Sequence, residues 1–195
     1  MPYSLAIFCG SYEDESTNAR LARSIMGNLL ADAWREIPLP PLDTLPPLRA
    51  RQVHEPPEPV VGLREALAAS DAALVVGPEL AGGMAGSLKN ALDWCISAPE
   101  GFYHRPVAIA SVSASGGENA LHQMARTLLW QGAHIVGAQG IVRGHFDERL
   151  IPVSYALADA LHEALRYPHT QASSSRAIAA SLGIHESPHF SAESV

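Results

Sequence analysis

Short, unbroken apolar segments alternate along the chain with segments whose apolar residues recur every three or four positions. The continuous apolar segments lie at residues 3–9, 72–77 and 107–113, and strands have this pattern when both of their faces are covered. The intervening segments have one apolar face, as helices that pack on a sheet do. Because parallel strands need a helical crossover between them, the alternation predicts an α/β protein with a parallel sheet between two layers of helices.

Two weaker segments, at residues 33–37 and 134–137, are candidates for two more strands. Five strands of this kind fit the order 2-1-3-4-5 of the flavodoxin-like fold, a three-layer sandwich that binds ligands where the strand order reverses. Amphipathic spacing predicts helices at residues 22–30, 63–70, 86–96, 121–129, 157–165 and 176–182.

The length and charge of the chain limit its domain organisation and its partners. A chain of 195 residues favours one main domain, which we assign to residues 1–168, with a C-terminal extension at 169–195 that holds a short helix and a loose polar tail. The net charge of −7, without a basic stripe, argues against binding to nucleic acid. There is no apolar segment of membrane-spanning length and no signal peptide pattern. We therefore expect a cytoplasmic protein that does not bind membranes.

Three further features have simple structural interpretations. Residues 38–59 contain eight of the fifteen prolines and are expected to form an extended surface connection, with a role in covering substrate or contacting a subunit as the alternative. Cys9 and Cys95 are too few for a disulfide framework and are expected to be small buried residues. Residues 185–189 spell the zinc-protease string HExxH, but Pro188 would break the helix that this chemistry needs. We therefore expect no metal site.

The loop after the first strand, at residues 10–18, has the composition of a phosphate-binding loop. Short polar side chains lie beside the start of a helix, at Ser11, Ser16, Thr17 and Asn18. Free amides at a helix N-terminus favour an anion such as phosphate. The alternative is a helix that is capped by Ser16 or Thr17 and has no ligand.

Two glycine-containing loops follow the third and fourth strands, at residues 78–86 and 113–117. Glycine lets the backbone approach a flat ligand closely and leaves its amides free to bond to it. Each loop alone could be a plain strand-to-helix turn, but three polar loops at one edge of a sheet are a more specific sign of a ligand site. The residues of these two loops that we expect at the ligand are Glu79, Leu80, Ala81, Gly82, Gly83, Ser113, Gly116 and Gly117.

Two motifs of the chain resemble those of the NADPH-dependent FMN reductase family, and the resemblance covers residues 3–165. The family's GSxRxxSxN loop is matched by Gly10, Ser11, Ser16 and Asn18. Its longer motif PEYNGSxPGxLKNAxDW is matched by Pro78, Glu79, Gly82, Gly86, Leu88, Lys89, Asn90, Ala91, Asp93 and Trp94. The resemblance implies noncovalently bound FMN, hydride transfer from NADPH or NADH, and an unidentified small-molecule acceptor. It also implies a homodimer or homotetramer with the flavin near the subunit interface. No catalytic acid, base or nucleophile is needed for this chemistry.

The chain departs from both motifs. Glu13 replaces the arginine of the first motif and is followed by Asp14 and Glu15. These carboxylates would repel a nearby phosphate, or would favour the helix dipole if they point outward. Leu80 and Ala81 replace the Tyr-Asn pair of the second motif. A second hypothesis therefore stands beside the first: a relative that has lost FMN and binds another small molecule, as a non-redox enzyme or as a binding protein.

Overall fold

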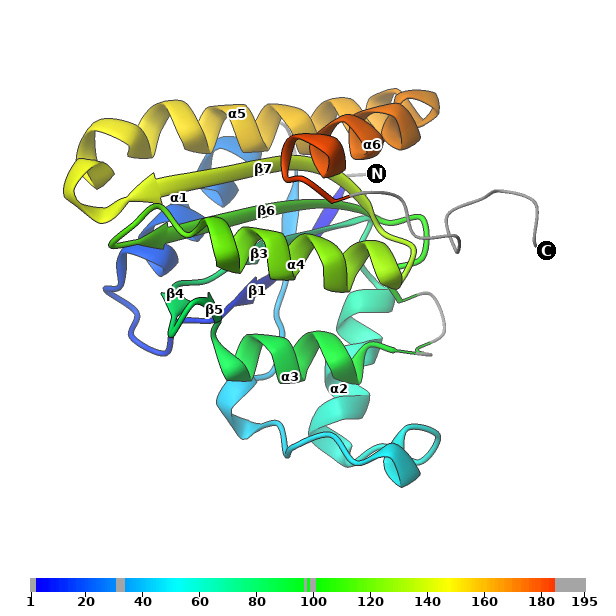
Figure 1. Cartoon of the computed structure of the whole chain (residues 1–195). Coiled ribbons are helices and arrows are strands. Elements are labelled where there is room, and N and C mark those ends of the chain that lie inside the picture. The colour runs from blue at the N-terminus through cyan, green and yellow to red at the C-terminus, as the bar shows by residue number, and fades with distance from the viewer. Residues whose placement is uncertain (1–2, 31–33, 97, 99–100, 185–195) are drawn as a thin grey trace.

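The fold is centred on one parallel sheet. The computed structural model describes residues 3–30, 34–96, 98 and 101–184. Five parallel strands form the sheet in the order β2-β1-β3-β6-β7 (Figure 1). Their bounds are Ser4–Cys9 for β1, Arg35–Ile37 for β2, Ala72–Val76 for β3, Pro106–Ser113 for β6 and His134–Val142 for β7. Counted along the chain, this order is 2-1-3-4-5, so the predicted fold class and strand order are confirmed.

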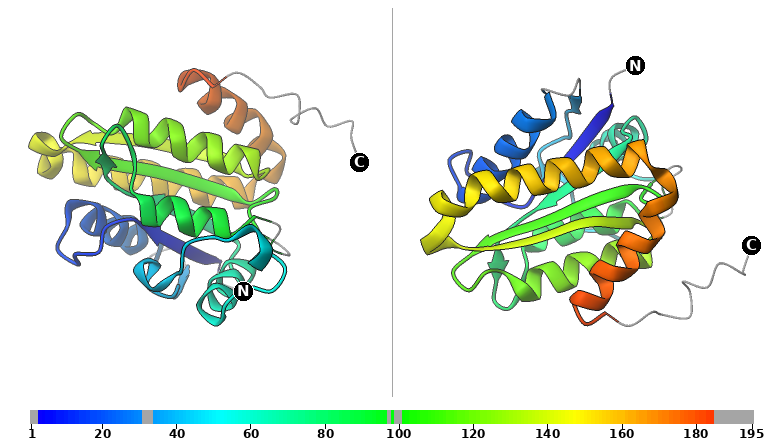
Figure 2. Two further views of the ribbon diagram at one scale, coloured as in Figure 1. Left: turned by 60° about the horizontal axis from the view of Figure 1, so that its bottom comes forward. Right: turned by 90° about the horizontal axis from the view of Figure 1, so that it is seen from above.

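Helices cover both faces of the sheet, as two further views show (Figure 2). The six helices of the described chain are α1 (Thr17–Leu30), α2 (Glu58–Ala68), α3 (Gly86–Trp94), α4 (Glu118–Trp130), α5 (Phe146–Arg166) and α6 (Gln171–Ser181). Helices α1 and α5 pack together on one face, and α2, α3 and α4 lie on the other. Helix α6, from the predicted C-terminal extension, packs beside the edge strand β7. None of the helices described here is long and apolar enough to cross a membrane.

Strand β3 shows why the sheet has two cores. All of its residues are buried, and successive side chains of a strand point to opposite faces. Ala73 and Val75 therefore join the core under α2, α3 and α4, whereas Leu74 and Val76 join the core under α1 and α5. An apolar run without polar interruptions is what this double burial requires, so the strand could be recognised in the sequence.

Strand β7 and helix α5 are longer than their predictions at 134–137 and 157–165. The second half of β7 contains Gln139 and Gly140, which interrupt the apolar pattern, yet its pairing with β6 continues to Val142. Pro152 lies inside α5 and obscures the first turns of the helix in the sequence. Gly137 lies against α5, where an added Cβ would be 2.8 Å from Leu157 Cδ2 and would displace that side chain.

The proline-rich connection at 38–59 is anchored to the body of the protein. It contains two 3-10 helices, Leu42–Thr44 and Ala50–Gln52, and buries Leu42 and Leu45. Trp94 Nε1 and Asn90 Nδ2 of α3 both donate to Pro46 O, at 2.7 and 3.0 Å. These contacts fix the segment to the body of the protein, so it is a packed strap rather than only the extended surface connection that the sequence predicted.

The two cysteines are both free. Cys9 is half-buried at the end of β1, and burial raises the pKa of the Cys95 thiol to about 12. The HExxH string at residues 185–189 lies outside the described residues. No group of three or more His, Cys, Asp or Glu residues within the described chain could hold a metal ion.

The side chain of Asn18 joins α1 to the far end of β6. Asn18 Nδ2 donates to Val112 O at 3.0 Å, and Val112 N donates to Asn18 Oδ1 at 2.9 Å. The asparagine is only 2% exposed, so both backbone groups of Val112 depend on this one side chain. Buried backbone groups that lose their partner are costly.

The substitution Asn18→Ala is expected to lower the free energy of unfolding by about 1–3 kcal/mol, because it leaves a buried N–H and a buried C=O without partners. Denaturant unfolding followed by circular dichroism measures this loss. The control is Asn28→Ala on the same helix, which removes one part-buried bond to Ser154 Oγ and should cost less. Equal losses for the two variants would contradict the structural role of Asn18.

Candidate functional site

Three loops meet at the carboxyl edge of the sheet. The connections that follow β1, β3 and β6 all lie at the same end of the strands (Figure 1). The hydrogen-bond ladder continues past the strands into these loops, because Gly10 N donates to Val76 O at 2.8 Å and Gly77 N donates to Ala110 O at 3.1 Å. A crevice at this edge, where the strand order reverses, is where open α/β sheets bind ligands.

The first loop ends at the start of α1. Ser16 is the N-cap, because its Oγ accepts a hydrogen bond from Ala19 N at 3.1 Å. Thr17 is the first residue of the helix, and the amides of Thr17 and Asn18 belong to the first turn, which has no intrahelical acceptors. Ser11 is partly exposed beside them. The loop therefore offers hydroxyl groups and helix N-terminal amides, the donors that an anion needs.

The acidic segment of the first loop is exposed to solvent. Glu13, Asp14 and Glu15 are all exposed. Arg23 of α1 binds this segment. Its Nη1 donates to Asp14 O at 2.6 Å, and its Nη2 forms an ion pair with Glu15 Oε1 at 3.8 Å. Exposed carboxylates act through water, where their repulsion of a second anion is weak. These carboxylates are therefore a small obstacle to a phosphate in the first loop.

The second loop contains a β-hairpin, whereas the sequence predicted a glycine-rich loop without strands. Strands β4 (Glu79–Leu80) and β5 (Gly83–Met84) are antiparallel, and Ala81 and Gly82 turn between them with φ of 49° and 74°. Two positive φ values define a type I′ turn, which favours Asn-Gly. Strands of two residues are too short to predict from periodicity. Leu80 is 58% exposed at this turn, so its side chain is not packed between the loops.

Glu79 attaches the hairpin to α4. Its carboxylate accepts hydrogen bonds from the backbone and side-chain nitrogens of Asn119, at 2.9 and 3.1 Å, and from Ala120 N at 3.4 Å. The Glu79 amide donates to Ser113 Oγ at 2.6 Å. These bonds hold the pKa of Glu79 below its usual value, and the bond from the Asn119 side chain has the largest effect. Glu79 thus fixes the second loop to the third.

The third loop lies directly on the end of β6. Gly117 has a φ of 79° and precedes α4, and a Cβ at this position would overlap the side chain of Ser111. Ser111 and Ser113 are buried, with their Oγ atoms 3.0 Å apart. Gly116 also has a positive φ, of 95°. The close approach to Ser111 requires glycine at position 117, and the positive φ favours glycine at position 116.

The predicted site residues divide into two groups. Those at least partly accessible from solvent are Ser11, Ser16, Thr17, Glu79, Leu80, Ala81 and Gly82. Those buried beneath the loops are Asn18, Gly83, Ser113, Gly116 and Gly117. The structure brings both groups to one edge of the sheet, and their contacts with a ligand stay predictions.

Two residues that support the site were not predicted. Asn119 donates to Glu79, as described above, and Gln123 Oε1 accepts from Met84 N of the hairpin at 3.1 Å. Both belong to α4. In the sequence they are ordinary polar residues on the exposed face of an amphipathic helix, so periodicity gives no sign of their role.

These features define a flavodoxin-like α/β protein in which three loops meet at the carboxyl edge of the sheet, the place where this fold binds ligands. The sequence model of the NADPH-dependent FMN reductase family matches residues 3–147. The chain belongs to this family. It is an oxidoreductase of the kind that uses FMN and takes electrons from NAD(P)H.

Known relatives agree with this assignment. A quinone reductase of Pseudomonas putida is 34% identical over 173 residues, which cover 80% of this chain and 91% of the relative. An NADPH azoreductase of Bacillus sp. (strain OY1-2) is 31% identical over 105 residues, 53% of this chain and 58% of that protein. Among solved structures, the flavoenzyme NAD(P)H:(acceptor) oxidoreductase FerB of Paracoccus denitrificans superposes with a TM-score of 0.64 at 20% sequence identity. The superposition covers 83% of this chain and 98% of the FerB chain. This last likeness supports the fold.

The residues at the edge of the sheet fit FMN. The first turn of α1 provides donors for a phosphate, and a Cβ built on Gly82 meets nothing within 4 Å, so the hairpin backbone is open to a ligand. The acidic side chains and Leu80 are exposed rather than packed into the loops. The two departures that suggested a relative without FMN therefore have a benign explanation, and that second hypothesis is not favoured.

The substitution Glu79→Gln is expected to lower the melting temperature at pH 7, because a neutral amide binds the two amides of α4 less strongly than a carboxylate does. A group with a depressed folded pKa stabilises the protein above its unfolded pKa and loses that effect as the pH falls through the folded pKa. The difference between variant and wild type should therefore shrink below about pH 4.5, the ordinary glutamate value. Thermal unfolding from pH 3 to pH 7 measures it.

The control for this prediction is Glu118→Gln, an exposed acidic residue in the first turn of the same helix. It should change the melting temperature less at pH 7. A deficit of Glu79→Gln that is the same at every pH would show that the charge of Glu79 is not what fixes the hairpin.

Proposed function

We propose that this protein is an FMN-dependent NAD(P)H reductase that passes electrons to a small aromatic acceptor of the quinone or azo class. The observation that carries the proposal is the attachment of three loops to one another at the carboxyl edge of the sheet, in a chain that matches most positions of both family motifs. Support for the acceptor class comes from the relatives, which are named quinone reductase and azoreductase.

Each loop has a role in this proposal. Ser11, Ser16 and Thr17, with the first amides of α1, would bind the phosphate of FMN. The hairpin at Ala81–Gly82 would contact the ring system through its backbone, because neither residue has a side chain long enough to block it. When bound, FMN supplies the hydride chemistry between the nicotinamide and the acceptor. The protein holds the reactants and stabilises negative charge with backbone N–H groups.

The supporting residues act one step away from the ligand. Glu79 and Gln123 hold the hairpin against α4, and Asn18 holds the start of α1 against β6. Such contacts keep the loop amides in one arrangement before the ligand arrives, so less conformational entropy is lost on binding. The chemistry needs no ionisable catalytic residue, and we assign none.

The first experiment is direct. The purified full-length protein should bind FMN, develop the visible flavin absorption band and oxidise NADPH or NADH when a quinone is added. The variant Ser11→Ala is expected to bind FMN about 10- to 100-fold more weakly, because a hydrogen bond to a charged group contributes about 1.5–3 kcal/mol. The control is Ser173→Ala on α6, a helix that contacts the start of β7 through Ser175. This variant should bind FMN as the wild type does.

A second variant tests the acidic segment. Glu13→Arg should change the affinity for FMN only a few-fold, because Glu13 is exposed to solvent. A wild-type protein that takes up no FMN and oxidises no nicotinamide would contradict the proposed function. A large gain of FMN affinity in Glu13→Arg would instead show that the acidic segment faces the phosphate.

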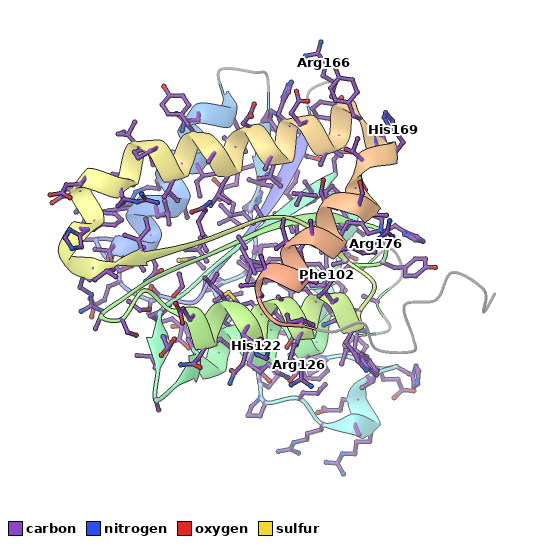
Figure 3. All side chains as sticks on the ribbon, turned by 45° about the horizontal axis from the view of Figure 1, so that its top comes forward. Phe102, His122, Arg126, Arg166, His169 and Arg176 are labelled. Atoms are coloured by element: carbon purple, nitrogen blue, oxygen red, sulfur yellow. The ribbon has the colours of Figure 1, made fainter. Side chains whose placement is uncertain are left out.

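We also propose that the protein forms a homodimer through a groove between α3 and α4. The groove has a volume of about 470 Å³ and is lined by Lys89, Asp93, Ile96, His122, Gln123, Arg126, Thr127, Trp130 and Gln131. Trp130 is 65% exposed, and a tryptophan of this kind is typical of interface hot spots. His122 and Arg126 lie along α4, the helix that ends at Trp130 (Figure 3).

The chemistry of the groove suits a second copy of the chain. It contains both charge signs, with Lys89 and Asp93 paired at 2.5 Å, and a two-fold axis lets such a surface complement itself. Gln123 lines the groove and also binds the hairpin. A partner bound there would therefore lie beside the proposed flavin site. A tetramer, the preference between NADPH and NADH, and the cytoplasmic location stay predictions from the sequence.

The substitution Trp130→Asp is expected to convert the dimer into a monomer, because a buried charge without a partner is strongly unfavourable at an interface. Sedimentation velocity measures the molecular mass. The control Tyr155→Asp changes another exposed aromatic residue, 61% exposed on α5, and should leave the dimer intact. A Trp130→Asp protein that sediments as the wild-type dimer would place the interface elsewhere.

A further inference from the structure

Two histidines lie side by side where β6 and β7 begin, at the end of the strands opposite the three loops. His134 begins β7 and pairs in register with Pro106 at the start of β6, and His104 lies in the turn just before Pro106. His104 Nδ1 is 3.4 Å from His134 Nε2, and the ring centroids are 5.2 Å apart. Nothing in the proposed redox function uses these two side chains.

The orientation of the His134 ring is fixed by Gln171. Gln171 Nε2 donates to Ala164 O at 2.8 Å, so the amide oxygen of the same side chain faces His134 Nδ1, at 2.9 Å. An oxygen can only accept, so His134 Nδ1 must carry the proton. The neutral ring then has its lone pair on Nε2, the nitrogen that faces His104.

The position of His104 is also held from several sides. Its φ is 56°, in the left-handed region that costs energy for a side chain with a Cβ. Its amide donates to Gly132 O at 2.8 Å, and its ring lies 4.0 Å from the ring of Tyr103, centroid to centroid. A strained residue persists where the surroundings determine its conformation. The result is an exposed imidazole held next to a second one.

We propose that His104 Nδ1 and His134 Nε2 together bind one divalent transition-metal ion of the Zn²⁺, Ni²⁺ or Cu²⁺ type. Two imidazole nitrogens at about 2.0–2.1 Å from a tetrahedral ion are about 3.4 Å apart, which is the separation found here. Imidazole is a preferred ligand of these ions. A metal-binding histidine commonly donates its other N–H to an oxygen, and Gln171 provides that oxygen for His134.

The site is open to solvent. No group of three or more His, Cys, Asp or Glu residues in the described chain could hold a metal ion, so the proposal rests on these two imidazoles alone. Binding needs the His104 proton on Nε2 rather than Nδ1. Both tautomers are neutral, so the ring keeps its proton and only changes the nitrogen that carries it.

An ion at this site would join three segments. His104 belongs to the turn before β6, His134 to β7, and Gln171 to the start of α6, where Ser175 Oγ also accepts from Ile135 N at 3.0 Å. Because a ligand of the folded state stabilises that state, occupancy should raise the melting temperature of the protein. This site lies at the amino ends of β6 and β7, whereas the proposed flavin site lies at the carboxyl ends of the strands. The two proposals can therefore fail independently.

The test uses the full-length protein without an affinity tag, stripped with a chelator and titrated with Cu²⁺ and Zn²⁺ by calorimetry. We expect one ion per chain, and nitrogen hyperfine structure from two imidazoles in the Cu²⁺ electron paramagnetic resonance spectrum. His104→Ala should weaken binding at least tenfold. Because His104 is exposed, this variant should fold, and His104→Gln provides a second one that retains a polar side chain.

Two controls remove histidines other than His104 and His134: His169→Ala, and the double variant His185→Ala with His189→Ala. Each should bind the ion as the wild type does. Loss of binding in either control, unchanged binding in His104→Ala, or no binding by the wild-type protein would overturn the proposal. FMN affinity, measured in the same variants, should be unaffected.

Discussion

The end of β6 is the point on which the site depends. Both backbone groups of Val112 are bonded to Asn18, and Ser113 accepts from the amide of Glu79. One strand end thus holds the first loop on one side and the second loop on the other. Because Asn18 and Val112 are buried, breaking either of their bonds leaves polar groups without water. The three loops are therefore fixed relative to one another by the same few atoms.

This arrangement gives the family motifs a structural meaning. Asn18 of the first motif and Glu79 of the second bind other parts of the protein, and so do Asn90 and Trp94, which hold the proline-rich strap at Pro46. In this chain, these motif residues build the scaffold around the site. The two departures from the motifs fall at exposed positions, the loop around Glu13 and the hairpin turn at Leu80 and Ala81. The chain therefore matches the family at motif residues that hydrogen-bond to other segments of the protein.

The sequence predicted what periodicity can reveal. Continuous apolar runs indicated β1, β3 and β6, and the strand order came from the fit of five alternating strands to the flavodoxin-like fold. The hairpin was missed because two-residue strands have no period, and the second half of β7 was missed because Gln139 and Gly140 interrupt it. Asn119 and Gln123 support the site from an exposed helix face, where their sequence pattern is that of any surface helix. Contacts between distant segments are not encoded in local spacing.

The central claim is that three loops, separated in sequence, form one binding site for FMN. Hydrogen exchange of the backbone amides, with and without saturating FMN, tests it most directly, because it reports on each loop separately. The account predicts slower exchange in residues 11–19, 79–86 and 114–120 together, and little change at His104 and in α6. Protection of only one of these loops, or protection at another surface, would contradict it.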